Sequence, residues 1–188
     1  MSGLFASYMR DKFSLSEEEL EAVSRRLRPV SLRRGEHLLR EGEICTWSAF
    51  VTDGAMVYYQ LIEGEEHVCD FAFETDWVSQ IKSFTQQAPA EMSIKAMEPC
   101  ELLVLSRDHM TELLREQPRL YEIRAQLAEE SFLLMNERNL SQTTLRAEDR
   151  YLRLMQTRPE VIRRAPQYYI ASYLGILPQS LSRIRKKL

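Results

Sequence analysis

The sequence predicts an α+β fold in which a β-rich central region lies between helical ends. Apolar residues recur at helical spacing before residue 29 and after residue 106, whereas between those points they form short runs at near-regular intervals. The 188 residues, of which 44% are hydrophobic and 28% charged, have an ordinary globular composition and suffice for one domain plus a small second one.

The first helix is predicted over residues 16–28. Ser16 and Glu19 have the spacing of a capping box, in which each side chain bonds the backbone N–H of the other residue. Pro29 is expected to end this helix, because proline lacks the N–H donor that a further turn requires.

The central region, residues 30–106, is predicted to form the short strands of a sandwich or barrel. The apolar and β-branched runs cover residues 50–51, 56–62, 68–73, 93–97 and 102–105. Asp53-Gly54 and Glu63-Gly64 mark turns between these runs. Residues 76–87 interrupt the series and are expected to be a short helix or a loop insert.

The helices return after Ser106, and a long one is predicted from Arg119 to about Leu145, followed by another over residues 147–156. The long helix carries two apolar stripes, one of Leu120, Ile123, Leu127 and Leu134 and one of Ala125, Ala128, Phe132 and Met135. One stripe can pack on the sheet of the same chain while the other meets a second copy. Alternatively, both belong to one broad face buried within a monomer.

The last 22 residues, 167–188, are predicted to form a helix-turn-helix. Gly175 can take the left-handed conformation after the first helix, and Pro178 is favoured at the first position of the second. The predicted core-facing residues are Ile170, Ala171, Leu174, Leu181, Ile184 and Leu188. The outer face of the second helix is then polar and basic, which is typical of a helix that enters the DNA major groove.

Charge supports DNA as the partner of this face. Residues 161–188 contain six Lys or Arg and no acidic residue, so their net charge is +6. Because the whole chain has a net charge of −3, residues 1–160 have a net charge of −9. Arg183 can pair with guanine and Gln179 with adenine, whereas Arg185, Lys186 and Lys187 suit phosphates. The candidate DNA-binding residues are Gln179, Ser180, Ser182, Arg183, Arg185, Lys186 and Lys187. The alternative is an ordinary helical hairpin with a solvated face.

Several other functions are not expected. Three cysteines without C-x-x-C spacing and three scattered histidines argue against a metal site, and no cofactor motif or nucleophile–base pair points to an enzyme. No 18-residue apolar run and no signal-peptide profile is present, so we expect a cytoplasmic protein that does not engage a membrane.

Two motifs carry a resemblance over nearly the whole chain. Leu32-x-x-Gly35-x-x-Leu38-x-x-Glu41-Gly42 is followed by Phe50-Val51-x-x-Gly54-x-x-x-Tyr58, and residues 170–188 read IASYLGILPQSLSRIRKKL. In this order they resemble the Crp/Fnr family of bacterial transcription regulators. The resemblance implies an antiparallel β roll (a jelly-roll-like double-stranded β-helix) with flanking helices over residues 1–118. It also implies a dimerisation helix over residues 119–145 and a DNA-binding helix-turn-helix domain over residues 146–188.

The same resemblance implies a homodimer on a palindromic double-stranded operator, with Gln179, Ser180 and Arg183 at the base-reading positions, and admits RNA polymerase as a further partner. Members that bind cyclic nucleotides use a Gly-Glu pair and an arginine. Here Ser79 and Gln80 stand at the pair, and the arginine position falls on Ala90 or Glu91. We therefore expect a degenerate cassette without cyclic-nucleotide binding.

The roll either binds an unknown small-molecule effector or uses the same side chains as core. The candidate pocket residues are Phe71, Phe73, Trp77, Gln80 and Phe84. The favoured function is a homodimeric, sequence-specific DNA-binding regulator. The alternative is a small-molecule-binding regulatory module without DNA-binding function, against which the basic outer face of residues 179–187 argues.

Overall fold

The structure, a computed structural model, describes residues 3–187 and confirms the α+β fold with an antiparallel roll. The strands are β1 (Arg28–Leu32), β2 (His37–Leu39), β3 (Trp47–Asp53), β4 (Met56–Ile62), β5 (Glu65–Ala72), β6 (Trp77–Val78), β7 (Ser93–Ala96) and β8 (Cys100–Ser106). The helices are α1 (Gly3–Phe13), α2 (Glu17–Ser24), α3 (Ile81–Gln86), α4 (Arg107–Glu116), α5 (Leu120–Thr144), α6 (Ala147–Thr157), α7 (Pro159–Arg164), α8 (Gln167–Tyr173) and α9 (Pro178–Lys187).

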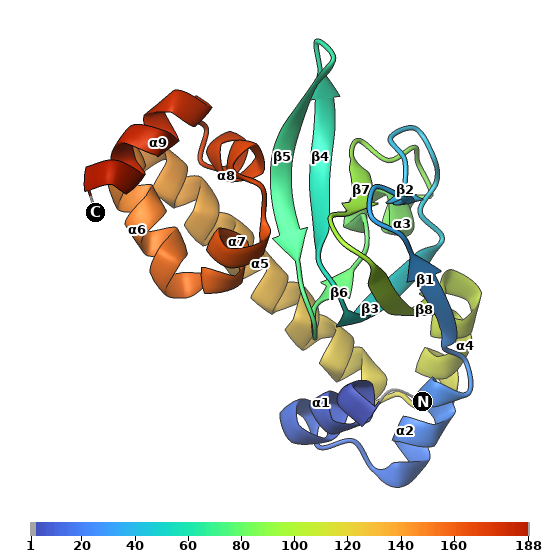
Figure 1. The fold of residues 1–188 in the computed structure, drawn as a ribbon. Coiled ribbons are helices and arrows are strands. Elements are labelled where there is room, and N and C mark those ends of the chain that lie inside the picture. Colours follow the sequence, from blue (N-terminus) through green and yellow to red (C-terminus); the bar gives the residue numbers. More distant parts are fainter. Residues whose placement is uncertain (1–2, 188) are drawn as a thin grey trace.

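The roll consists of two four-stranded antiparallel sheets (Figure 1). Their strand orders are β1-β8-β3-β6 and β2-β7-β4-β5. Apolar side chains from both sheets form one buried cluster, which includes Val51, Met56, Ile94 and Leu102. The short apolar runs predicted from the sequence are therefore the strands whose inward side chains fill the roll.

The N-terminal edge of the roll differs from the prediction. Ser16 Oγ accepts the Glu19 N–H at 3.2 Å and Glu19 Oε2 accepts the Ser16 N–H at 2.8 Å, so the capping box forms as expected. However, α2 ends at Ser24, and Pro29 lies inside β1, where it pairs with Leu103 of β8. β1 is an edge strand, and an edge position tolerates proline because its missing N–H can face away from the sheet.

The predicted insert over residues 76–87 is part strand and part helix. β6 pairs with β3 at the edge of the first sheet, with Trp77 opposite Phe50. α3 follows at once, and the side chain of Gln80 caps it by accepting the Ser83 N–H. The segment therefore belongs to the roll instead of leaving it.

α1 is an element that the sequence analysis did not predict. Phe5, Met9 and Phe13 are 0%, 3% and 6% exposed and share one face, because they are four residues apart. They pack in one cluster with Phe50 and Leu105 of the roll, and the Phe5 and Phe50 ring centroids are 5.2 Å apart. The i, i+4, i+8 spacing of the three side chains was a readable signal for this helix.

α5 runs from the N-terminal helices to the C-terminal helices (Figure 1). Leu120 and Ile123 are buried near its start. Further along, the large apolar side chains are exposed: Phe132 (58%), Leu133 (59%), Leu134 (66%), Met135 (56%) and Leu140 (62%). The second stripe is thus uncovered in the monomer.

The first predicted stripe is divided: Leu120 and Ile123 are buried, whereas Leu134 is exposed. One turn before it, Glu130 pairs with Lys12 of α1 at 2.6 Å, and one turn after it, Arg138 donates to Val68 O of β5 at 3.3 Å. The body of the chain reaches α5 on both sides of Leu134 through long polar side chains, so no apolar surface packs on the intervening turn.

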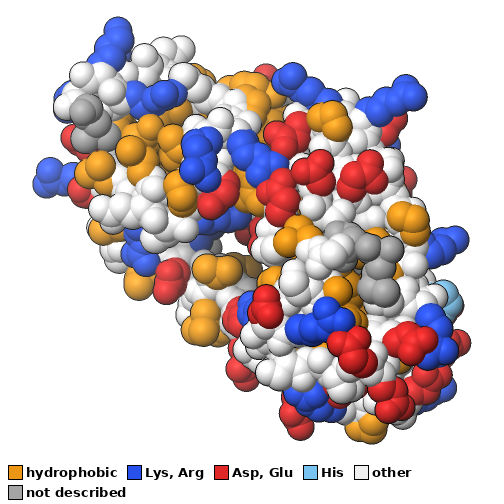
Figure 2. Space-filling model, turned by 60° about the horizontal axis from the view of Figure 1, so that its bottom comes forward, with side chains coloured by type: hydrophobic (Ala, Val, Ile, Leu, Met, Phe, Trp, Pro, Cys, Tyr) orange, Lys and Arg blue, Asp and Glu red, His pale blue; other side chains and the backbone are white. Residues whose placement is uncertain are grey.

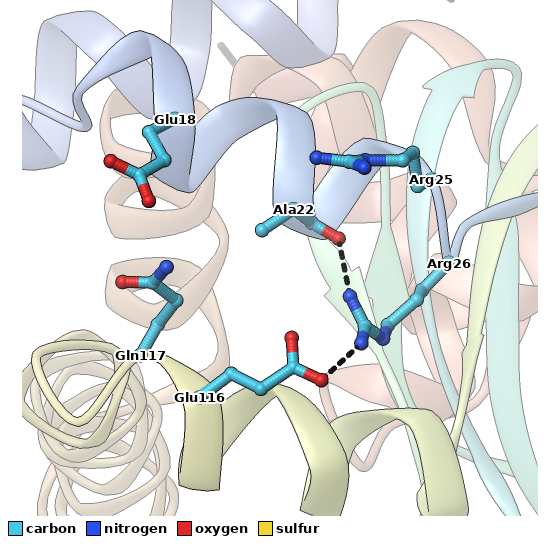
Figure 3. Close-up of a pocket in the computed structure, with 6 residues that line it drawn as sticks. All are labelled: Glu18, Ala22, Arg25, Arg26, Glu116 and Gln117. Atoms are coloured by element: carbon cyan, nitrogen blue, oxygen red, sulfur yellow. Dashed lines mark hydrogen bonds and ion pairs between the residues drawn. The ribbon is translucent and has the colours of Figure 1, made fainter.

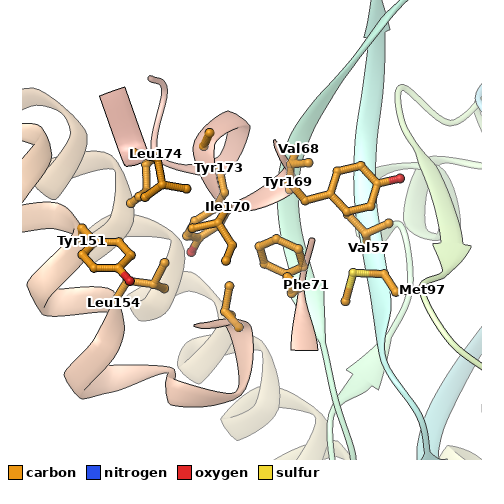
Figure 4. Close-up of a cluster of buried hydrophobic side chains, with 14 of the residues drawn as sticks. Val57, Val68, Phe71, Met97, Tyr151, Leu154, Tyr169, Ile170, Tyr173 and Leu174 are labelled. Carbon is orange, nitrogen blue, oxygen red and sulfur yellow. The ribbon is translucent and has the colours of Figure 1, made fainter. Parts of the chain in front are cut away.

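The C-terminal helices pack on the outer face of the second sheet. One cluster of buried side chains joins Val57, Val68 and Phe71 of the roll to Tyr169 and Tyr173 of α8 (Figure 4). The Phe71 and Tyr173 ring centroids are 5.2 Å apart. The roll and the C-terminal helices therefore share a continuous core. Leu188, predicted to face this core, lies outside the described residues. Within residues 3–187, no helix combines the length and apolar character needed to span a membrane.

Candidate nucleic-acid interface

The turn between α8 and α9 has the geometry that the sequence predicts. Gly175 has a φ of +66°, and its N–H donates to Ser172 O at 3.0 Å. The N–H of Ile176 donates to Ala171 O, also at 3.0 Å. These two bonds make a Schellman motif, which satisfies carbonyls at the end of α8 and turns the chain sharply. Both helices are thereby held at a fixed angle.

α9 presents its polar side outward. Leu181 and Ile184 are 0% and 8% exposed and belong to the core shared with the roll. The seven predicted DNA-binding residues lie on the rest of the helix, and all but the half-buried Ser180 are exposed: Gln179, Ser182, Arg183, Arg185, Lys186 and Lys187. The arrangement brings the predicted base-reading and phosphate-binding residues onto one accessible surface.

The cations of α9 differ in whether they form an ion pair within the described residues. Lys187 Nζ lies 3.7 Å from a carboxylate oxygen of Glu148 in α6, with both side chains largely in solvent. Among residues 3–187, no ion pair engages Arg183, Arg185 or Lys186. These three side chains are available to a polyanion, and Lys187 can exchange a weak surface pair for a phosphate.

Other cations near the C-terminus are committed to the roll. Arg164 donates from Nη1 and Nη2 to the two oxygens of Glu74 at 2.6 and 2.8 Å, and it also pairs with Glu98. Arg158 Nη1 lies 2.5 Å from Asp70 Oδ1. We call these five residues the arginine latch. Arg164 belongs to the basic C-terminal segment that is predicted to face DNA, but carboxylates of the same chain neutralise its charge.

The carboxylates of the latch are held in the charged state by their arginine partners. Figure 2 shows Asp and Glu interspersed with Lys and Arg around the N-terminal helices, whereas Lys and Arg outweigh Asp and Glu towards the C-terminal helices. Hydrogen bonds from Arg164 lower the pKa of Glu74 to about 2, despite its partial burial. Glu74 therefore remains ionised at neutral pH and holds its cation.

The latch should make the fold sensitive to acid. Because the pKa of Glu74 falls from 4.5 in the unfolded chain to about 2 in the folded one, its contribution is complete above pH 4.5 and is lost as pH falls towards 2. We expect on the order of 2 kcal/mol from this one group. Urea unfolding at pH 7, 5, 4 and 3 should show a steeper loss of stability for the native chain than for Glu74→Gln. Parallel pH profiles would contradict this assignment.

The sensor end carries its own internal pairs at the position of the predicted cassette. Gln80 is 6% exposed, and its side chain caps α3. Lys82 forms an ion pair with Glu91, one of the two residues at the arginine position. The hydroxyl of Ser83 donates to Ala88 O at 2.5 Å. The polar groups of this segment thus already have partners within the chain.

The five predicted pocket residues are distributed over different parts of the roll. Phe71 and Phe73 lie in the core between the roll and the C-terminal helices, whereas Phe84 lies inside the roll. Trp77 packs against Phe5 and Phe50 on the opposite side, with its ring 5.5 Å from that of Phe50. Gln80 acts as a helix cap. The aromatic side chains accordingly serve three different clusters.

A hollow of about 420 Å³ lies between α2 and α4. It is lined by Glu18, Ala22, Arg25, Arg26, Glu116 and Gln117 (Figure 3). Arg26 donates to Ala22 O at 3.2 Å and to Glu116 at 2.6 Å, so its guanidinium closes the gap between the two helices. Within the described residues, no group of three or more His, Cys, Asp or Glu is arranged to hold a metal ion.

Comparisons with known proteins agree with this architecture. Residues 29–117 match the family model of the cyclic nucleotide-binding domain. No curated protein matches the sequence. One similar solved structure is the c-di-GMP-responsive global regulator CLP of Xanthomonas campestris, with a TM-score of 0.71, 18% identity, and coverage of 92% of this chain and 91% of that one.

Two further solved structures share the fold. FixK2 of Bradyrhizobium japonicum has a TM-score of 0.72 and 17% identity, with coverage of 86% of this chain and 84% of that one. A CooA variant of Carboxydothermus hydrogenoformans has a TM-score of 0.69 and 14% identity, with coverage of 95% and 81%. At these identities the similarity establishes the common fold, including the long helix and the C-terminal helices.

Proposed function

We propose, from the premise that this chain has a cyclic nucleotide-binding domain within the fold of the Crp/Fnr transcription regulators, that it is a homodimeric, sequence-specific DNA-binding regulator of transcription. The observation that carries the proposal is the exposed outer face of α9, which holds three unpaired cations among the described residues and no acidic residue. A helix of this kind, mounted on a glycine turn, fits the DNA major groove.

Within that proposal the residues of α9 divide by role. Gln179, Ser180 and Arg183 contact base edges, and Arg183 is the residue suited to a bidentate pair with guanine. Arg185, Lys186 and Lys187 contact phosphates, which supply affinity without sequence information. Ser182 lies on the same exposed face. These roles are supported by the exposure of the side chains and by their order along the helix.

The dimer follows from the exposed apolar side chains of α5. Phe132, Leu134 and Met135 are more than half exposed, although they are large apolar side chains on one long helix. A soluble monomer seldom exposes such a contiguous patch. Two copies related by a two-fold axis would bury these side chains against each other and place two α9 helices on one DNA duplex.

The roll is proposed to work without a cyclic nucleotide. Lys82 already pairs with Glu91, and the carboxylate would repel an incoming phosphate if that pair opened. RNA polymerase and a small-molecule effector of another kind are partners inferred from the resemblance alone.

Genomic footprinting tests this function directly. We expect protected sites to be inverted repeats whose half-sites are about one helical turn, roughly 34 Å, apart. Addition of cyclic AMP or cyclic GMP should leave operator affinity unchanged, and calorimetry should detect no low-micromolar site for either nucleotide. A site of that affinity would contradict the degenerate cassette. Failure to protect any sequence would favour a regulatory module without DNA-binding function.

A further inference from the structure

β5 is a common anchor for helices from three parts of the C-terminal half. Arg138 of α5 donates to Val68 O at 3.3 Å, and the Val68 N–H donates to Ser172 Oγ of α8 at 2.9 Å. Arg158, between α6 and α7, pairs with Asp70 and donates to Phe71 O at 2.7 Å. One strand of the roll therefore positions the long helix and the helix-turn-helix together.

An apolar core lies beneath these bonds. Tyr173 packs against Phe71, and the guanidinium carbon of Arg138 lies 4.3 Å from the centroid of the Tyr173 ring. Tyr169 donates to Glu66 Oε2 at 2.6 Å. Apolar burial is non-directional and keeps the two units together, whereas charge-assisted bonds such as those of Arg158 and Arg164 are directional and fix the angle at which the units meet.

The latch lies apart from the proposed DNA surface. The side chains of Arg158 and Arg164 are 26% and 25% exposed and face carboxylates of the roll. Arg183 and the other cations of α9 are exposed. Arg158 and Arg164 therefore lack the free guanidinium that a phosphate contact requires, although they belong to the basic half of the chain.

We propose that Arg158 and Arg164 are specificity-determining residues for operator spacing, an inference that rests on the proposed dimeric DNA-binding function. Through Asp70 and Glu74 they set the orientation of α9 relative to α5. If α5 forms the dimer, that orientation sets the distance and angle between the two recognition helices. Each added base pair rotates one half-site by about 34° around the duplex, so a rigid dimer accepts one spacing.

Two double variants test the arginine latch, one in the C-terminal helices and one in the roll. Arg158→Gln/Arg164→Gln removes the cations from the helix-turn-helix unit, and Asp70→Asn/Glu74→Gln removes carboxylates from the roll, where they cannot touch DNA. Arg163→Gln is the matched control. Arg163 is exposed, and its ion pair with Glu160, at 3.9 Å, lies within α7 and does not connect the helix to the roll. The probes are duplexes built from the footprinted half-site: a single half-site, and inverted repeats at the native spacing or shifted by one or two base pairs.

The native chain and Arg163→Gln should lose about tenfold in affinity per base pair of altered spacing, because the duplex must twist to compensate. Both latch variants should bind the shifted repeats within about threefold of the native repeat. Their single half-site affinity should match that of the native chain, which also reports that α8 and α9 remain folded.

Two results would overturn the inference while the proposed function stands. Unchanged spacing preference in both latch variants would show that the apolar core alone sets the orientation. Uniformly weaker binding of every duplex by the arginine variant, with the carboxylate variant unaffected, would make Arg158 and Arg164 phosphate contacts. If the native chain bound neither the half-site nor the repeats, the proposed function would fail and the inference with it.

Discussion

Leu134→Glu should convert the dimer into a monomer and abolish operator binding at nanomolar protein concentrations. Leu134 is 66% exposed in the single chain, so a charge there does not disturb the core of the monomer. In a two-fold dimer the change removes two buried leucines, worth roughly 1.5–3 kcal/mol each, and buries two carboxylates without partners. We expect the dimer dissociation constant to rise by a factor of about 1,000 or more.

Analytical ultracentrifugation at micromolar concentration measures this change directly. The native chain should sediment at twice the chain mass and the variant at the chain mass. Leu61→Glu is the matched control, because Leu61 is 52% exposed on the β4–β5 hairpin and lies away from α5. If Leu134→Glu remained dimeric, the exposed apolar side chains of α5 would not form the interface. A native monomer would remove the reason to expect a palindromic operator.

Arg183→Ala and Lys187→Ala should affect DNA binding in different ways, the first through sequence discrimination and the second through overall affinity. Arg183 is exposed and free of ion pairs among the described residues, so it is available for a bidentate pair with a base. Its loss should remove discrimination at one base pair per half-site, on the order of 1–3 kcal/mol each. Loss of Lys187 should instead weaken binding to all sequences alike. It should also reduce the salt dependence of the affinity, because a phosphate contact releases counterions whatever the sequence.

Titrations of each variant against operator and scrambled duplexes at several salt concentrations separate the two roles. Arg163→Ala, which removes an exposed cation outside α9, serves as the control for net charge. If Arg183→Ala weakened binding to both duplexes equally, Arg183 would be a phosphate contact, and the proposed placement of α9 in the major groove would be wrong. No effect from either variant would leave the face of α9 as a solvated surface.

Local patterns determined the elements on which the proposed function depends. The capping box of α2, the strand runs between residues 47 and 106, and the glycine turn before α9 all involve residues within about five positions of one another. Backbone conformation and side-chain period act over that range, so the sequence reports them. The inward placement of Leu181 and Ile184 and the outward placement of Arg183 followed from the same period.

The tertiary structure alone decided how distant segments use these residues. Pro29 became part of a strand, which is tolerated because β1 lies at a sheet edge. The first stripe of α5 is buried at Leu120 and Ile123 and exposed at Leu134. Five aromatic and polar residues that the sequence grouped as a pocket separated into different clusters because they face opposite sides of the roll.

Arg164 shows the physical reason for this division. Composition counted it with the cations of the recognition segment, yet it pairs with Glu74, which lies 90 residues away in the sequence. Neither periodicity nor spacing encodes a pair at that separation, because it depends on the docking of α8 against β5 and on the shared core beneath. The sequence alone therefore determined which helix presents its basic face outward, and the packing of that helix unit on the roll decided which cations remain free for a partner.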